Sequence, residues 1–158
     1  MNSIIDGVRI GVVATIGVDL AALFSRQLLR LPTTDWALMG RWFGHGLNGV
    51  FMHAHIAKSE PIPHERVIGW AGHYLTGVAY AVIYMGIVES LPAAAPSVRS
   101  AIVFGLATLA APWLLVQPLM GAGVFAMSTP HPWPIRIANA LMHLVFGAGL
   151  FAGWVLVG

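Results

Sequence analysis

The chain contains no cysteine and few charged residues. The lack of cysteine excludes disulfide bonds, thiolate metal sites and cysteine nucleophiles. Only 9% of the 158 residues are charged, whereas 58% are hydrophobic. Soluble domains carry about 25% charged residues. The composition therefore indicates a membrane protein rather than a water-soluble domain.

Familiar signatures of catalysis and of nucleotide binding are also missing. Neither G-x-S-x-G nor H-E-x-x-H occurs, and Gly44, Gly46 and Gly49 form no phosphate-binding pattern. The net charge of +2 is small and spread along the chain, which argues against a nucleic-acid partner. The expected partner is the lipid bilayer, with a homo-oligomer or a membrane-protein partner left open.

Four long apolar runs, each long enough to cross a bilayer, define the expected fold. They cover residues 8–29, 67–89, 98–120 and 135–157. Residues 34–48 mix tryptophan with charged side chains, which predicts an interfacial helix in the long first connection, capped by Thr34 or Asp35. Pro112 and Pro118 predict a kink or break near the end of the third run. We expect one all-α transmembrane domain over residues 1–158.

Lysine and arginine are distributed unevenly between the two expected membrane faces, and this sets the orientation. The first and third connections, with the helix ends beside them, hold six basic residues: Arg26, Arg30, Arg41, Lys58, Arg66 and Arg136. The opposite face holds Arg9 and Arg99. The asymmetry predicts a cytoplasmic first connection and two termini outside the cytoplasm.

Three ionisable residues lie inside the apolar runs at a matched distance from an arginine. Asp19 lies seven positions before Arg26. His73 lies seven positions after Arg66, and His143 lies seven positions after Arg136. If these arginines mark one membrane face, the three groups lie about 10 Å deep at 1.5 Å per residue. Ionisable groups at such depth are costly and usually functional. The spacing predicts a polar site between helices near the cytoplasmic face.

Supporting polar groups fall on the same helices. Tyr80 shares a helix face with His73, Asn139 shares one with His143, and Gln117 lies beside the proline disturbance. In one interpretation these groups only bond to one another, and each bond contributes roughly 0.6–2 kcal/mol to helix packing. In the other they form a site for a metal, a cofactor or protons.

His73 and His143 are the expected cofactor ligands, because two imidazoles on facing helices can bind the iron of haem b. For a metal ion, the expected ligands are the same two histidines with Asp19, His53 and Glu65, since a carboxylate can complete or orient histidine ligation. The loop sequence His53-Ala54-His55 can also offer two imidazoles to one cation. No residue is assigned a catalytic role.

The order of several short motifs resembles a known bacterial family. The motifs are Gly40-Arg41-Trp42, His53, Glu65, Gly69-Trp70, His73-Tyr74, Gln117-Pro118, Gly121-x-Gly123, Thr129-Pro130 and His143-x3-Gly147. Together they resemble domain-of-unknown-function family 2938 over essentially the whole chain. The resemblance implies a small multi-pass protein of the bacterial inner membrane, and it implies no activity.

Four classes of function remain open from the sequence. The leading hypothesis is an integral membrane protein whose His/Asp site binds a metal or haem or relays protons. The second is a small transporter of a cation or small polar substrate. It would have to be oligomeric, because four spans are few for a pathway. The third is a structural accessory subunit that packs through glycine-rich faces, of which Gly7 and Gly11 form one. An enzyme acting on a lipid-soluble substrate is also conceivable.

Overall fold

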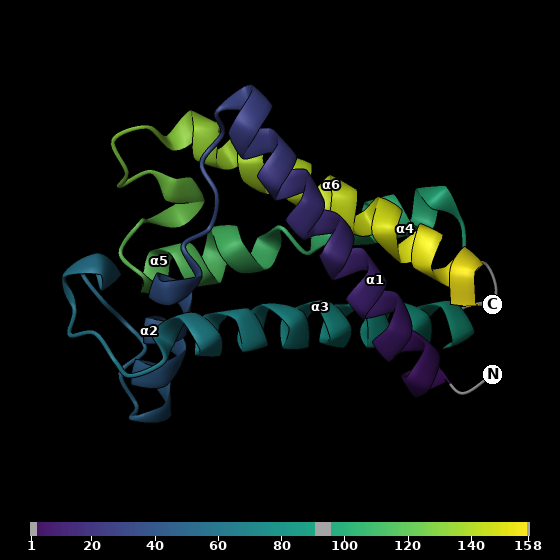
Figure 1. Ribbon diagram of the computed structural model, residues 1–158, viewed down its shortest axis with the longest axis horizontal. Helices are drawn as coiled ribbons and strands as arrows, with labels where there is room; N and C mark the ends of the chain where they lie inside the picture. The colour runs from purple at the N-terminus through teal and green to yellow at the C-terminus, as the bar shows by residue number, and fades with distance from the viewer. Residues whose placement is uncertain (1–2, 91–95, 158) are drawn as a thin grey trace. The chain divides into compact units, whose positions relative to one another are not determined.

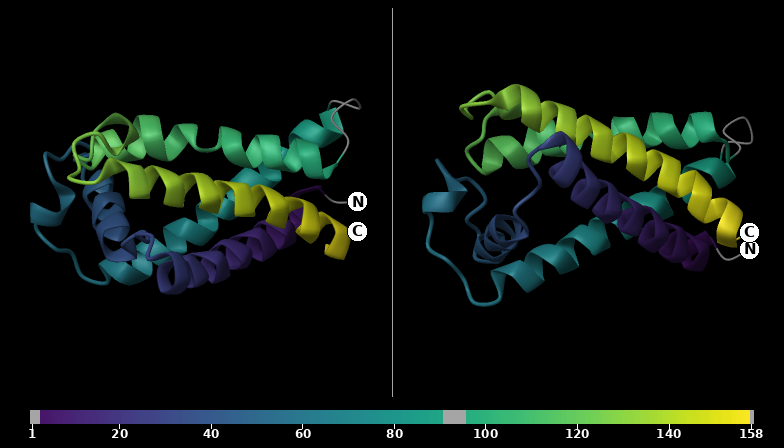
Figure 2. Two further views of the ribbon diagram at one scale, coloured as in Figure 1. Left: turned by 90° about the horizontal axis from the view of Figure 1, so that it is seen from above. Right: turned by 45° about the horizontal axis from the view of Figure 1, so that its top comes forward.

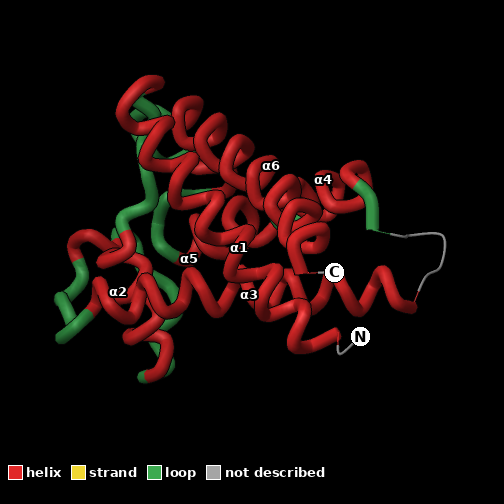
Figure 3. The backbone as a smooth tube through the Cα atoms, turned by 45° about the vertical axis from the view of Figure 1, so that its right-hand side comes forward, coloured by secondary structure: helices red, strands yellow, loops and turns green. Residues whose placement is uncertain are grey.

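The computed structural model describes residues 3–90 and 96–157, and these residues form helices and loops without a strand (Figure 3). The helices, labelled in Figure 1, are α1 (Ser3–Phe24), α2 (Trp36–Leu47), α3 (Glu65–Ser90), α4 (Val98–Ala107), α5 (Gln117–Leu119) and α6 (Pro132–Val157). Shorter π or 3-10 turns are η1 (Ser25–Leu29), η2 (Ile56–Lys58), η4 (Pro112–Val116) and η5 (Val124–Ala126). The expected all-α class is confirmed.

Four helical stretches are long and apolar enough to cross a membrane. They are Ile4–Leu29, Glu65–Ser90, Val98–Leu119 and Pro132–Val157, close to the four expected runs. Large apolar side chains such as Leu23, Val103 and Leu156 are exposed on these stretches. Exposed apolar surface on this scale suits contact with lipid rather than with water. The chain therefore has the architecture of a multi-pass membrane protein.

The amphipathic segment of the first connection folds as α2. Asp35 has extended backbone dihedral angles and caps the helix, since its side chain accepts the N–H of Ala37 at 2.9 Å. This bond satisfies one of the free donors of the first turn. The expected helix and one of its two expected caps are confirmed, and its position at the membrane surface stays a prediction.

The third span is interrupted, as its prolines predict, but the α-helix stops near the middle of the span rather than near its end. Helix α4 ends at Ala107, and Thr108 and Leu109 form a turn before the helix resumes. The π turn η4 begins at Pro112, whose ring cannot supply a backbone N–H. A π turn inside an α-helical span is a local irregularity that often lies at a functional site.

The described chain divides into two compact units, and each is described by itself. Unit 1 contains Met1–Arg30, Tyr74–Leu109 and Asn139–Gly158, and unit 2 contains Leu31–His73 and Ala110–Ala138. The expectation of a single transmembrane domain over residues 1–158 stays a prediction.

Glycines set the helix separation in unit 1. A Cβ atom added at Gly11 of α1 would lie 2.6 Å from the Cα of Val78 in α3, and one added at Gly105 of α4 would lie 2.7 Å from the backbone of Gly147 in α6. A Cβ at Gly7 would lie 2.9 Å from a methyl of α3. Small residues allow this backbone approach, on which helix association in lipid depends. The expected close-packing face at Gly7 and Gly11 is confirmed.

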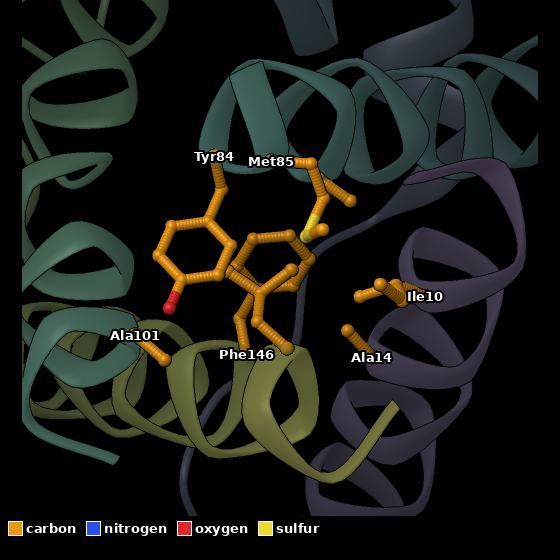
Figure 4. Packing of buried hydrophobic residues seen from close by; sticks show 8 residues of the cluster. Ile10, Ala14, Tyr84, Met85, Ala101 and Phe146 are labelled. Atoms are coloured by element: carbon orange, nitrogen blue, oxygen red, sulfur yellow. The ribbon is translucent and has the colours of Figure 1, made fainter. Parts of the chain in front are cut away.

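The core of unit 1 is formed by side chains from α1, α3, α4 and α6 (Figure 4). Ile10, Tyr84, Met85 and Leu150 are almost fully buried. The hydroxyl of Tyr84 lies 3.0 Å from Oγ of Ser100 in α4, so the buried phenol has a polar partner. Buried aromatic hydroxyls normally find such a partner.

Unit 2 joins α2 to the first turns of α3 by direct backbone contact (Figure 2). A Cβ at Gly40 would collide with the carbonyl of Glu65, and a Cβ at Gly69 would collide with the carbonyl of Trp36. The connection after α2 is bonded to the end of the third span, because the N–H of His53 donates to the carbonyl of Leu119 at 2.8 Å. These contacts fix the frame around the loop histidines.

Candidate functional site

The break in the third span makes a backbone carbonyl available. Pro112 has no N–H and so cannot bond the carbonyl of Thr108, four residues earlier. The chain tightens at this point, because the N–H of Leu109 bonds the carbonyl of Leu106, three residues earlier, at 3.1 Å. The carbonyl of Gly105, four residues before Leu109, is therefore the one made available. The carbonyl of Gly105 accepts the hydroxyl of Thr108 at 2.6 Å. The break thus places a hydroxyl and a carbonyl next to each other.

His143 of α6 lies against this pair. Its Nδ1 is 2.7 Å from Oγ1 of Thr108 and 3.3 Å from the carbonyl oxygen of Gly105. The single hydroxyl proton of Thr108 is already donated to Gly105, so Nδ1 must carry the imidazole proton and donate. In neutral His143 the lone pair is then on Nε2. Ring N–H groups held in this way are typical of histidines that bind a metal.

Asp19 is also hydrogen-bonded within unit 1. The hydroxyl of Tyr74 donates to its Oδ2 at 2.8 Å. Tyr80, further along α3, packs edge-on against Phe146 at 6.3 Å between ring centroids. Asn139 of α6 is half-buried. Asp19 therefore bonds to Tyr74, and His143 bonds to Thr108. Neither partner belongs to the site expected from the sequence.

His73 belongs to unit 2, where aromatic rings hold it. Its imidazole stacks on Trp36 with ring centroids 4.1 Å apart and an interplanar angle of 28°. Trp70 contacts it edge-on at 5.7 Å. The pairing of His73 with His143 on one haem or metal stays a prediction.

Glu65 forms an ion pair with Arg41. Arg41 donates from Nε to Oε2 at 2.8 Å and from Nη2 to Oε1 at 3.0 Å. The bonds to Glu65 raise the pKa of Arg41 above its ordinary value, against the opposing effect of burial. The N–H of Ile62 also donates to Oε2, at 3.3 Å. A metal ion at Glu65 would have to compete with these donors.

His53 pairs with His45 rather than with its neighbour His55. Nδ1 of His45 lies 2.9 Å from Nε2 of His53, and Nε2 of His45 lies 3.0 Å from the carbonyl oxygen of Glu60. Nδ1 of His53 and Oε1 of Gln117 are buried and have no hydrogen-bond partner among the residues described. Buried polar atoms without a partner are rare.

Within residues 3–90 and 96–157, no group of three or more His, Cys, Asp or Glu side chains is arranged to hold an ion. A metal would therefore depend on one or two of these side chains with other ligands completing its coordination. The expected metal ligands Asp19, His53, Glu65, His73 and His143 stay predictions.

Several residues of the site were not expected from the sequence. Thr108 carried one usable signal, because it stands four residues before Pro112 and so begins the disturbed turn. The pairing of His45 with His53 carried none, since His45 lies near the end of α2 and His53 lies in the irregular loop that follows, so no helix or strand period relates them. Arg41 stood in a motif of the resemblance, and no sequence rule paired it with Glu65.

A family model described as "Protein of unknown function (DUF2938)" matches residues 8–157. The chain belongs to this family. No curated protein and no solved structure matches the chain. Most of the motifs that resemble DUF2938 lie in unit 2, including the residues of the Arg41–Glu65 ion pair and His53. Membership of DUF2938 assigns no activity.

Proposed function

We propose that this DUF2938 protein is a multi-pass protein of the bacterial inner membrane that binds haem iron or a transition-metal ion through Nε2 of His143. The orientation of the His143 ring is the observation that carries the proposal. Thr108 and Gly105 hold Nδ1 as the donor, so Nε2 offers a lone pair without any proton loss. Haem iron and borderline metal ions both accept an imidazole nitrogen.

The remaining site residues have supporting roles in this proposal. In unit 1, Asp19 balances positive charge on the metal, and the hydroxyl of Tyr74 orients its carboxylate. Tyr80 and Asn139 of the same unit are assigned to polar positions around the ligand. In unit 2, the Trp36 stack limits the ring rotation of His73, which stays an expected imidazole ligand, and Gln117 stays an expected supporting residue.

The test uses the purified full-length chain, without an affinity tag, in mild detergent. The expected result is either a Soret band or close to one metal ion per chain by elemental analysis, which separates the two ligand classes. His143→Ala abolishes the Soret band or lowers the metal content by one ion per chain, whereas His131→Ala, at an exposed loop position, leaves both unchanged. A wild-type chain that stays empty after reconstitution with haem and with Zn²⁺, Cu²⁺ and Ni²⁺ refutes the proposal. In that case a purely structural role for His143, as in an accessory subunit, is favoured.

Transport of a cation or small polar substrate is the second candidate, and the broken third span favours it. The interruption at Thr108 and Leu109, followed by the π turn at Pro112, supplies irregular backbone of the kind that transporters place along a substrate path. Four spans are few for such a path, so this function needs an oligomer. A strict monomer by light scattering in detergent, with no uptake in proteoliposomes, contradicts it.

A further inference from the structure

Two histidine rings of unit 2 face each other across one short hydrogen bond. Nδ1 of His45 lies 2.9 Å from Nε2 of His53, and the centroids of the two rings are 5.1 Å apart. We propose that these two nitrogens bind one transition-metal ion in place of the proton that they share. A site on this pair does not rest on the function proposed for His143.

His45 is already oriented as a ligand. Its Nε2 lies 3.0 Å from the carbonyl oxygen of Glu60 and can only donate to it, so the neutral ring keeps its lone pair on Nδ1. A remote ring N–H bonded to a backbone carbonyl is the usual support of a metal-binding histidine. Nδ1 of His45 is therefore available to His53 as an acceptor and to a metal ion as a ligand.

His53 reaches the same state by a tautomer change. In the hydrogen-bonded pair its proton is on Nε2 and is donated to His45. When Nε2 binds the ion, this proton transfers to Nδ1, and the ring stays neutral. Nδ1 is buried without a partner among the described residues, and so is Oε1 of Gln117, an acceptor of the same unit. The backbone N–H of His53 bonds the carbonyl of Leu119, two residues beyond Gln117. Nδ1 of His53 and Oε1 of Gln117 therefore lie on two segments that are hydrogen-bonded to each other.

The loop that carries His53 is held in place before an ion arrives. Nη1 of Arg41 donates to the carbonyls of Ile56, Ala57 and Ser59 at 3.3, 3.4 and 2.9 Å. Ordering the loop in advance lowers the entropy lost on binding. His53 is buried, whereas His45 is only half-buried, so the side of the pair that His45 occupies is the more open to an ion. With metal–nitrogen distances of about 2.0–2.1 Å, the facing nitrogens need only separate to roughly 3.3–4 Å.

The donor set points to a particular class of ion. Imidazole nitrogen favours copper, nickel and zinc over magnesium or calcium. Since no cluster of three or more His, Cys, Asp or Glu side chains exists within the described ranges, water must complete the coordination. The site therefore binds reversibly, and Cu²⁺ should bind most tightly of the divalent ions.

The test titrates Cu²⁺ into the tag-free, full-length chain in detergent and records its electron paramagnetic resonance spectrum. We expect a saturable Cu²⁺ signal with hyperfine coupling to two imidazole nitrogens, with one such ion per chain in the His143→Ala variant, which lacks the ligand proposed in unit 1. His45→Ala and His53→Ala each leave one nitrogen and weaken binding at least about tenfold. His55→Ala, at an exposed histidine of the same loop, leaves the spectrum and the affinity unchanged.

A thermal measurement keeps the result interpretable if a variant is less stable. Saturating Cu²⁺ should raise the melting temperature of the His143→Ala chain and not that of the same chain with His45→Ala or His53→Ala added, because a ligand stabilises only a state that binds it. The His143→Ala background removes the ligand proposed in unit 1, so the copper signal reports on the pair alone. A His143→Ala chain without saturable binding at one ion per chain, or one that binds equally well after His45→Ala is added, overturns the proposal.

Discussion

Arg41 holds both carboxylate oxygens of Glu65, with N–H···O distances of 2.8 and 3.0 Å. The third nitrogen of the same guanidinium donates to backbone carbonyls of the connection between α2 and α3. One side chain thus joins α2, the connection and the first turn of α3. A planar group with five donors can do this, whereas an ammonium group cannot reproduce the paired geometry.

Replacing Arg41 by lysine should loosen the connection while keeping the charge. We expect Arg41→Lys to lower the melting temperature in detergent and to expose residues 48–64 to proteolysis, because the carbonyls of Ile56 and Ser59 lose a shared donor. Arg66→Lys is the matched control, since Arg66 is the exposed neighbour of Glu65. Equal cleavage rates in the two variants would show that Arg41 does not hold the connection.

The glycine contact between α2 and α3 gives a second prediction. At Gly69 an added methyl meets the backbone of α2, whereas at Gly86 of the same helix nothing lies within 4 Å. We expect Gly69→Ala to cost about 1–3 kcal/mol in unfolding free energy, as overpacking usually does. Gly86→Ala should be neutral or stabilise by up to about 1 kcal/mol through helix propensity. Reversible unfolding of both variants in mixed detergent provides the measurement, and equal stabilities would show that this contact adjusts without strain.

Thr108 should control the ligand affinity of His143 without touching the ligand. Thr108→Val removes the hydroxyl that fixes the ring, and loss of such a support typically weakens metal binding by about 10–100-fold. Thr108→Ser keeps the hydroxyl and should retain affinity. Titration of haem or metal into both variants measures the difference, with helix content by circular dichroism as the check on folding. If valine and serine bind equally, the hydroxyl does not orient His143.

Much of the fold follows from simple sequence patterns, whereas the partners of the polar residues do not. Run lengths located the four membrane-length helices, and Asp35 and Pro112 marked a cap and an irregular turn, because each acts through its own backbone neighbourhood. The partners of Asp19, Glu65 and His53 lie 55, 24 and 8 residues away in the chain. Such pairings depend on tertiary packing, which no local period encodes. Seven-residue spacing from arginine pointed to Asp19, His73 and His143, which are half-buried, and it could not show that Tyr74 and Thr108 are the partners of Asp19 and His143.

The orientation in the membrane can be tested cleanly because the chain has no cysteine of its own. A single introduced cysteine is then the sole target for a thiol reagent that does not cross membranes. Lys58 and Glu89 are both exposed and lie in the first connection and near the end of the second span. The excess of lysine and arginine near the first and third connections predicts that Lys58 lies in the cytoplasm.

We therefore expect Glu89→Cys to react in intact spheroplasts and Lys58→Cys to react only after the membrane is permeabilised. Both variants should be labelled equally in detergent, which controls for the intrinsic reactivity of each position. The reverse pattern would show that the long connection faces outward. That orientation would contradict the prediction from lysine and arginine, which favour the cytoplasmic side. In that case the His45–His53 pair would meet metal ions from outside the cell rather than from the cytoplasm.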